Sequence, residues 1–165
     1  MMGFASRGDL LARSNARRLA QLAVPADMDM VPDDALRIAI AGGGLSAFTD
    51  DEQAAITLAL DAIDRALADA DALLLSYGVA ATARTTLLAR LSSTVALYYL
   101  QGAERMTDDV RRAYESALET LKANARGEVD LTPPEETDPP PSDDLAVIES
   151  GPSRFGHARK CGDWQ

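Results

Sequence analysis

The chain has 165 residues, a formal net charge of −10 and only 5% aromatic residues. This length fits one domain with an extension. Its apolar residues are mostly Ala and Leu, which favour helices, whereas few side chains suit a sheet, so we expect an all-α fold. The acidic total argues against a free DNA-binding domain, because phosphate neutralisation supplies most of that affinity.

The sequence shows no sign of disulfides, of a signal peptide or of a membrane span, and these features bear on where the protein is found. The single cysteine, Cys161, excludes an intramolecular disulfide and fits a reducing compartment. The first residues have no apolar core of signal-peptide length. No window approaches 18 uninterrupted apolar residues, so we expect no membrane span.

Charge is distributed in blocks. Residues 1–25 carry four Arg and one Asp, and residues 26–80 carry eleven acids and two Arg. Residues 129–150 carry seven acids and no base, and residues 151–165 carry three bases and one acid. Blocks of alternating sign suit complementary contacts between neighbouring subunits.

N-cap residues and helix-breaking Pro and Gly residues predict the bounds of the first two helices. One helix is expected from Arg7 to Leu22, with Ser6 as its N-cap and Asp9 as the capping-box acid. A short helix from Asp33 to Ala41 follows Pro32, and Gly42–Gly44 ends it. This glycine run lacks a following Lys-Ser/Thr and no strand precedes it, so a turn is a better interpretation than a phosphate loop.

The clearest prediction is a long helix from Asp50 to Tyr77. Thr49 is its N-cap and Glu52 its capping-box acid. Its expected inner seam recurs in steps of three and four: Ile56, Leu60, Ile63, Leu67, Ala70 and Leu74. About 28 residues give a rod of ~42 Å, long for so small a domain. We therefore expect part of its surface to be buried against another chain.

Two further helices complete the expected bundle. One runs from Ala83 to Gln101, with its apolar side formed by Leu87, Leu88, Leu91, Val95, Tyr98 and Tyr99. The other follows the cap Thr107 and ends at Gly127, with a seam of Val110, Tyr114, Ala117, Leu121 and Ala125. The predicted domains are a small helical bundle over 1–127, a Pro- and acid-rich linker over 128–150, and a C-terminal arm over 151–165.

The arm combines bases with aromatic residues, which dominate interface energetics. A short apolar run, Leu145–Ile148, precedes it and can add a strand to a partner. Plain disorder is the alternative. The candidate docking residues of the linker end and the arm are Val147, Ile148, Arg154, Phe155, Arg159, Lys160 and Trp164.

Motifs of catalysis are missing from the sequence, so we expect no enzyme and no cofactor. His157, Cys161 and Asp163 have suitable chemistry for a metal, but no fourth ligand accompanies them, and we expect no metal site. Four acids of the long helix, Asp61, Asp64, Asp69 and Asp71, are best interpreted as a solvated face; in a ring, such faces can also line a negatively charged channel. The candidates for a subunit interface or channel lining are Arg13, Arg17, Asp61, Asp64, Arg65 and Asp69.

Several segments, taken in order, resemble the small head–tail connector proteins of Mu-like tailed phages. The opening Gly3–Arg13 followed by Arg18–Leu22 is similar to the family's first helix, and Ala62–Leu67 leading to Ser76-Tyr77 is similar to its long helix. Leu91–Leu100 resembles a further helix of that family. The most specific part is Arg112–Lys122 followed by Ala125–Leu131, which resembles the closing signature, and Ser153–Phe155 resembles the C-terminal arm.

This resemblance implies a structural virion protein of the head–tail neck, made in the host cytoplasm. It implies an adaptor that forms a ring, of twelve copies, beneath the portal and extends the DNA channel toward the tail. Its partners would be the portal protein, neighbouring copies of itself and the next neck or tail protein, with DNA passing through without specific binding and no membrane contact. A second hypothesis, motivated by the charge of −10, is an acidic regulatory binding protein such as a DNA mimic.

Overall fold

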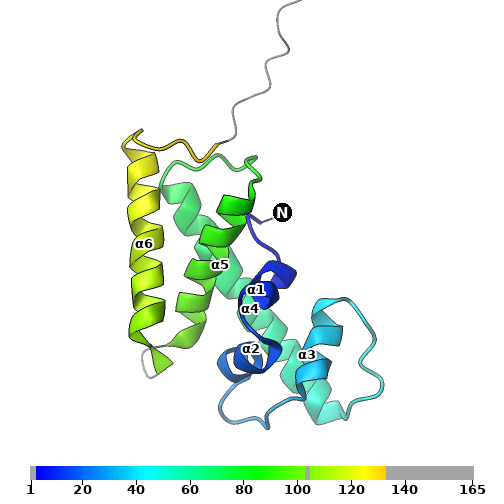
Figure 1. Cartoon of the computed structure of the whole chain (residues 1–165). Helices are drawn as coiled ribbons and strands as arrows, with labels where there is room; N and C mark the ends of the chain where they lie inside the picture. Colours follow the sequence, from blue (N-terminus) through cyan, green and yellow to red (C-terminus); the bar gives the residue numbers. More distant parts are fainter. Residues whose placement is uncertain (1–2, 103–104, 133–165) are drawn as a thin grey trace, which may run out of the picture. The chain divides into compact units, whose positions relative to one another are not determined.

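The computed structural model of the protein describes residues 3–102 and 105–132. These residues belong to one compact unit. Figure 1 shows the arrangement of the six helices in this part, which contains no strand: α1 (Arg7–Arg13), α2 (Ala16–Ala23), α3 (Asp33–Ile40), α4 (Asp50–Ser76), α5 (Thr86–Gln101) and α6 (Asp108–Ala125). The expected all-α fold is confirmed.

Helix α4 is the 27-residue axis of the bundle, and α2, α3 and α5 all pack against it. It begins where the sequence predicts. The Thr49 side chain accepts a hydrogen bond from the backbone N–H of Glu52, and the Glu52 side chain accepts one from the backbone N–H of Thr49. The predicted seam faces inward: Ile56, Ile63 and Leu74 are fully buried. Gly78, with φ of +83°, follows the cap residue Tyr77 and turns the chain away.

The expected single helix from Arg7 to Leu22 is wrong, because the structure divides it into α1 and α2. The break lies at Ser14 and Asn15, which both have extended backbone. The Asn15 side chain accepts a hydrogen bond from the backbone N–H of Arg18 at 2.7 Å and so caps a new helix. The break lets both short helices contribute to one core, in which Leu10 and Leu19 are fully buried.

Helices α5 and α6 lie side by side. Helix α5 begins at Thr86, three residues later than expected, because Thr85 is the N-cap and accepts from the backbone N–H of Leu88. Leu87 and Tyr99, on the predicted apolar side of α5, are exposed, and so is Ala125, the last residue of the seam predicted for α6.

An aromatic cluster joins α5 to α6. The rings of Tyr98 and Tyr114 stack with centroids 3.8 Å apart, and the ring of Tyr99 lies at an angle to both. Burial, followed by a hydrogen bond with Tyr114, raises the pKa of Tyr99 to about 12. The Tyr98-Tyr99 pair is therefore part of the packing between helices, as its position on the apolar side predicts.

The packed core continues past Gly127, where the sequence places the end of the helical domain. Asn124 donates a hydrogen bond from Nδ2 to the backbone carbonyl of Tyr77 and accepts one at Oδ1 from the backbone N–H of Leu131, both at 3.1 Å. Leu131 is buried as a result. The described chain thus ends beside the C-terminal end of α4.

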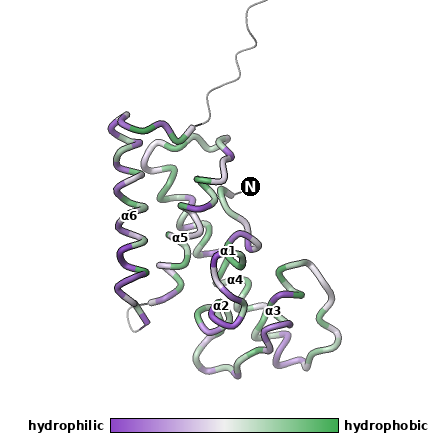
Figure 2. The backbone as a smooth tube through the Cα atoms, viewed as in Figure 1, coloured by the Kyte–Doolittle hydropathy of each residue, from purple (hydrophilic) through white to green (hydrophobic). Residues whose placement is uncertain are grey.

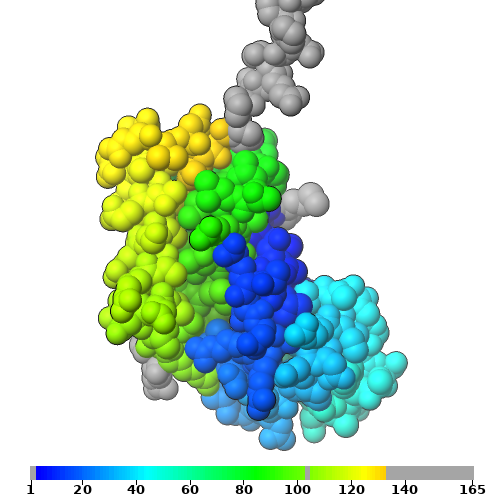
Figure 3. All heavy atoms as spheres, in the orientation of Figure 1, coloured from blue at the N-terminus to red at the C-terminus, as the bar shows by residue number. Residues whose placement is uncertain are grey.

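The helices differ in the hydropathy of their residues (Figure 2). Figure 2 shows many hydrophilic residues along α6, whereas hydrophobic stretches recur along α4 and α5. Figure 3 shows α1 and α2, in blue, on the face between α6 and the segment that contains α3. None of the described helices is long and apolar enough to cross a membrane.

Candidate docking groove

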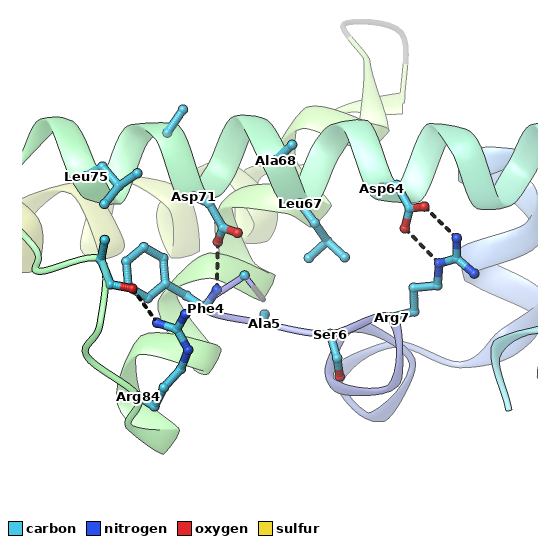
Figure 4. A pocket seen from close by; sticks show the side chains of 13 residues that line it. Phe4, Ala5, Ser6, Arg7, Asp64, Leu67, Ala68, Asp71, Leu75 and Arg84 are labelled. Atoms are coloured by element: carbon cyan, nitrogen blue, oxygen red, sulfur yellow. Dashed lines mark hydrogen bonds and ion pairs between the residues drawn. The ribbon is translucent and has the colours of Figure 1, made fainter. Parts of the chain in front are cut away.

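A groove lies between the N-terminal segment and the outer side of α4 (Figure 4). Its volume is about 660 Å³, within the range of roughly 300–1,000 Å³ typical of ligand pockets. Residues 3–7 form one wall, and Ala81 and Arg84 from the loop after α4 close one end. The α4 side consists of Asp64, Leu67, Ala68, Asp71, Ala72 and Leu75. We call this site the N-terminal groove.

Asp71 fixes the N-terminal wall to the bundle. Its Oδ1 accepts a hydrogen bond from the backbone N–H of Phe4 at 3.2 Å and another from the Ser92 hydroxyl at 3.0 Å. Ser92 is fully buried on α5. One carboxylate therefore connects three segments that are distant in sequence.

Gly3 permits this close approach. A Cβ atom at this position would overlap Oδ2 of Asp71, and the carboxylate has little freedom to move because it already accepts two hydrogen bonds. The glycine is therefore needed for space rather than for an unusual backbone angle.

An ion pair closes the other end of the groove. The Arg7 guanidinium donates from Nε and Nη2 to the two carboxylate oxygens of Asp64, at 2.7 and 2.5 Å. The hydrogen bond from Arg7 lowers the pKa of Asp64, and burial opposes this effect. The same hydrogen bond raises the pKa of Arg7. This two-point contact holds the start of α1 against α4.

Phe4 and Arg84 form the end of the groove nearest to Leu75. Phe4 is 7% exposed, and the Arg84 guanidinium carbon lies 5.4 Å from the centroid of its ring. Arg84 also donates to the backbone carbonyls of Ala81 and Ala83. Figure 4 shows Arg84 beside the Phe4 ring, below the Leu75 end of α4.

The floor of the groove is apolar and open. Ala68 and Ala72 are exposed, and Leu75 retains 46% of its accessible surface. Small side chains at the first two positions leave the helix surface accessible, and Leu75 adds an apolar end wall. An apolar floor with a few polar groups at its ends is the usual character of a site that binds an aromatic or aliphatic group.

The candidate interface residues predicted from the sequence lie on the surface but do not form one cluster. Asp61, Arg65 and Asp69 are exposed on α4. Arg13 ends α1 and Arg17 lies in α2; both are exposed, and no ion pair joins either of them to the acids of α4 in the part of the chain that the structure describes.

Two acids of α4 depart from the interpretation as a solvated face. Asp64 is paired with Arg7, and Asp71 is partly buried and accepts from Phe4 and Ser92. The face is consequently less negative than the sequence indicates. The candidate docking residues Val147, Ile148, Arg154, Phe155, Arg159, Lys160 and Trp164, and also His157, Cys161 and Asp163, lie outside the described residues.

The N-terminal groove is not evident from the sequence. Its two walls are about 60 residues apart in the chain, and no motif connects them. A second, smaller hollow of about 390 Å³ lies among Asp27, Asp29, Asp51 and Glu52. Within residues 3–102 and 105–132, no group of three or more His, Cys, Asp or Glu side chains is arranged to hold a metal ion.

The described residues form a small helical bundle with an apolar groove beside α4. Residues 4–150 match the family model described as Bacteriophage Mu, Gp36. Because this match covers most of the chain, the protein belongs to that family, and the expected relationship to Mu-like phage proteins is confirmed. Family membership indicates a structural or morphogenesis protein of a phage. No curated protein matches the chain.

Proposed function

We propose that this protein is a head–tail connector, an adaptor that forms a ring on the portal and extends the DNA channel toward the tail. The family match over residues 4–150 carries this proposal, because it covers both the helical bundle and the acidic linker. The ordered series of segments that resemble connector proteins supports the finer assignment to the neck of the virion.

The first half of α4 offers a surface for a neighbouring subunit. Its outer side presents Ala54, Leu58, Asp61 and Arg65 at heptad spacing, and all four are exposed. Leu58 retains 43% of its accessible surface. An exposed apolar residue beside one acid and one base suits contact with a neighbouring copy that presents a base to the acid and an acid to the base.

The charge pattern supports passage of DNA rather than its binding. The described residues of α4 carry the exposed acids Asp61 and Asp69 and only one base, Arg65. Carboxylates that face a channel would repel the phosphate backbone and allow DNA to slide. The linker and arm supply the contact to the portal, through the residues around Ile148 and Phe155.

Co-assembly with the portal of its own phage tests this proposal. Full-length protein should sediment with portal rings and add a ring of density in electron micrographs. A chain that ends at Ser150 should bind the portal more weakly. Equal binding by the two chains would refute the role of the arm.

Substitution of the proposed subunit contact tests the ring itself. Leu58→Asp should reduce the number of copies bound per portal, because it places a charge in an apolar contact. Ala113→Asp, at an exposed position of α6 rather than α4, is the matched control and should bind like wild type. Equal loss by both variants would argue against this contact.

An acidic regulator that mimics DNA is the competing function, favoured by the net charge of −10. Such a protein would bind a nucleic-acid enzyme, and added DNA or salt would displace it. Binding to the portal that withstands salt and DNA would count against this alternative.

A further inference from the structure

We propose that Arg17 of one copy binds, in the connector ring, to a patch formed by Tyr99 and Asp69 of the neighbouring copy. The inference rests on the proposed ring and names a contact between its subunits. Asp69 then belongs to this contact, so Asp61 rather than Asp69 is available to face the DNA channel.

The patch combines an exposed aromatic ring with a carboxylate. Tyr99 retains 38% of its accessible surface, although its ring packs at an angle against Tyr98 and Tyr114. Asp69 is exposed on α4. Burial and a hydrogen bond with Tyr114 raise the pKa of Tyr99, and the negative charge of Asp69 adds to the increase. The carboxylate of Asp69 therefore lies near the Tyr99 hydroxyl.

An aromatic ring beside a carboxylate suits an arginine. A guanidinium group stacks on aromatic faces and also forms two-point ion pairs with carboxylates, a combination that lysine does not match. Asp69 forms no ion pair with any residue that the structure describes, so it is accessible to a base from another chain. Tyrosine and arginine are also enriched among the residues that dominate interface energies.

Arg17 is the base that is best placed to bind this patch. It is exposed in the first turn of α2, and it pairs with no acid in residues 3–102 and 105–132. Arg18 is half-buried. Hydrogen bonds from Ser6 lower the pKa of Asp9, and the charge of Arg13 adds to this effect, so Arg13 already faces an acid of its own chain.

The charge blocks of the chain favour the same pairing. Arg17 lies in residues 1–25, which carry four Arg and one Asp, whereas Asp69 lies in residues 26–80, which carry eleven acids and two Arg. The exposed bases of that second block, Arg37 and Arg65, are surrounded by acids in the sequence. Contact between the two blocks of neighbouring copies brings opposite charges together.

The arginine and the patch lie on different sides of the bundle. Asp71 on α4 accepts from Phe4, which leads into α1, and Asp69, two residues earlier, points about 200° away around the helix axis. Helix α5 lies between α1 and α6 in Figure 1, and α6 carries Tyr114 beside the patch. Arg17 therefore meets the patch of another copy. Such a contact joins two different surfaces, which is the type that closes into rings.

Reversal of the two charges tests the contact on the portal. Arg17→Asp and Asp69→Arg each bring like charges together, so each should lower the number of copies bound per portal in native mass spectrometry. The double variant restores opposite charges and should recover the wild-type number. Arg37→Asp, at an exposed position of α3, makes the same charge change as Arg17→Asp and is the matched control. All three positions are exposed, so urea midpoints should match wild type.

The aromatic part of the patch is tested by two substitutions of Tyr99. Tyr99→Phe keeps the ring and should keep the number of bound copies. Tyr99→Leu keeps an apolar side chain without a ring and should lower this number. Equal numbers for the two variants would exclude the ring from the contact.

Cross-linking tests which surfaces meet. The chain with Arg17→Cys and Asp69→Cys, in which Cys161→Ser removes the native thiol, should give a ladder of dimers, trimers and larger species with a bifunctional maleimide on the portal. A mixture of chains that each carry one of the two new cysteines should stop at dimers. A double-cysteine chain that also stops at dimers would contradict a contact between two different surfaces.

The outcomes separate this contact from the connector role. A wild-type ring on the portal, with single reversals that bind like Arg37→Asp or a double variant that fails to recover, would overturn the contact and leave the connector role intact. No wild-type ring on an intact portal would refute the connector role and this contact with it.

Discussion

Replacement of Asp71 by Ala tests how the groove is built. This change removes the acceptor for the backbone N–H of Phe4 and for the hydroxyl of Ser92. The hydrogen bond from the Phe4 N–H is only partly buried, so water can replace the lost acceptor, whereas Ser92 is fully buried. The N-terminal wall should then separate from α4.

The expected loss of unfolding free energy follows from the Phe4 N–H and the Ser92 hydroxyl, which both lose their acceptor. A buried polar group without a partner costs about 1–3 kcal/mol, and loss of a hydrogen bond to a charged acceptor near the surface adds about 1 kcal/mol. The Ser92 hydroxyl can rotate toward the carbonyl one helical turn back, which lowers the first value. We therefore expect Asp71→Ala to lower the free energy of unfolding by about 2–3 kcal/mol. For a domain of this size, that corresponds to a fall in Tm on the order of 10 °C.

Urea unfolding followed by circular dichroism provides the assay, with the midpoint compared at constant slope. Asp69→Ala is the matched control, because Asp69 is exposed on the same helix and should change stability by less than about 0.5 kcal/mol. In the double variant Asp71→Ala with Ser92→Ala, both partners are absent, so the cost should be smaller than the sum of the two single changes. Equal stability of the Asp71→Ala and Asp69→Ala proteins would refute this account of the groove.

Other predictions concern caps and ion pairs. Arg7→Ala should cost less than about 1 kcal/mol, because the Arg7–Asp64 pair is partly exposed. Folding lowers the pKa of Asp64, so the pair stabilises the fold at pH values above the ordinary pKa of 3.8 and loses this effect as pH falls through the pKa of Asp64 in the folded protein. The difference in stability between Arg7→Ala and wild type should therefore vanish in acid, and it should shrink in high salt. Thr49→Ala should cost about 1 kcal/mol and speed hydrogen exchange in the first turn of α4. Asn124→Ala should cost about 1–3 kcal/mol and expose residues 128–132 to proteolysis, whereas unchanged cleavage would show that Leu131 is held by other contacts.

The helices that the sequence predicts best are those with local signals at their ends. The Thr49–Glu52 capping box and Gly78 fix α4 to within one residue of the expected range. The break between α1 and α2 was missed because the apolar stripe continues across it, from Leu10 to Leu19. Asn15 was the available signal, since Asn is a preferred N-cap.

The groove could not be predicted, because it depends on contacts distant in sequence. Asp71 differs from Asp69 only in the direction in which its side chain points on α4, and both look alike in the sequence as acids between alanines. The role of Gly3 likewise follows from the position of Asp71, about 70 residues away. Local patterns predict which residues form helices, whereas the surface between residues 3–7 and α4 depends on how the elements pack.

The most direct test of the connector proposal is the mass of the purified protein, alone and mixed with the portal of its own phage, by native mass spectrometry or light scattering. We expect a monomer alone and a symmetric ring in the presence of the portal, which would show an adaptor that assembles on a template. A monomer in both samples, with the portal itself intact as a ring, would contradict the proposal and favour the acidic regulator.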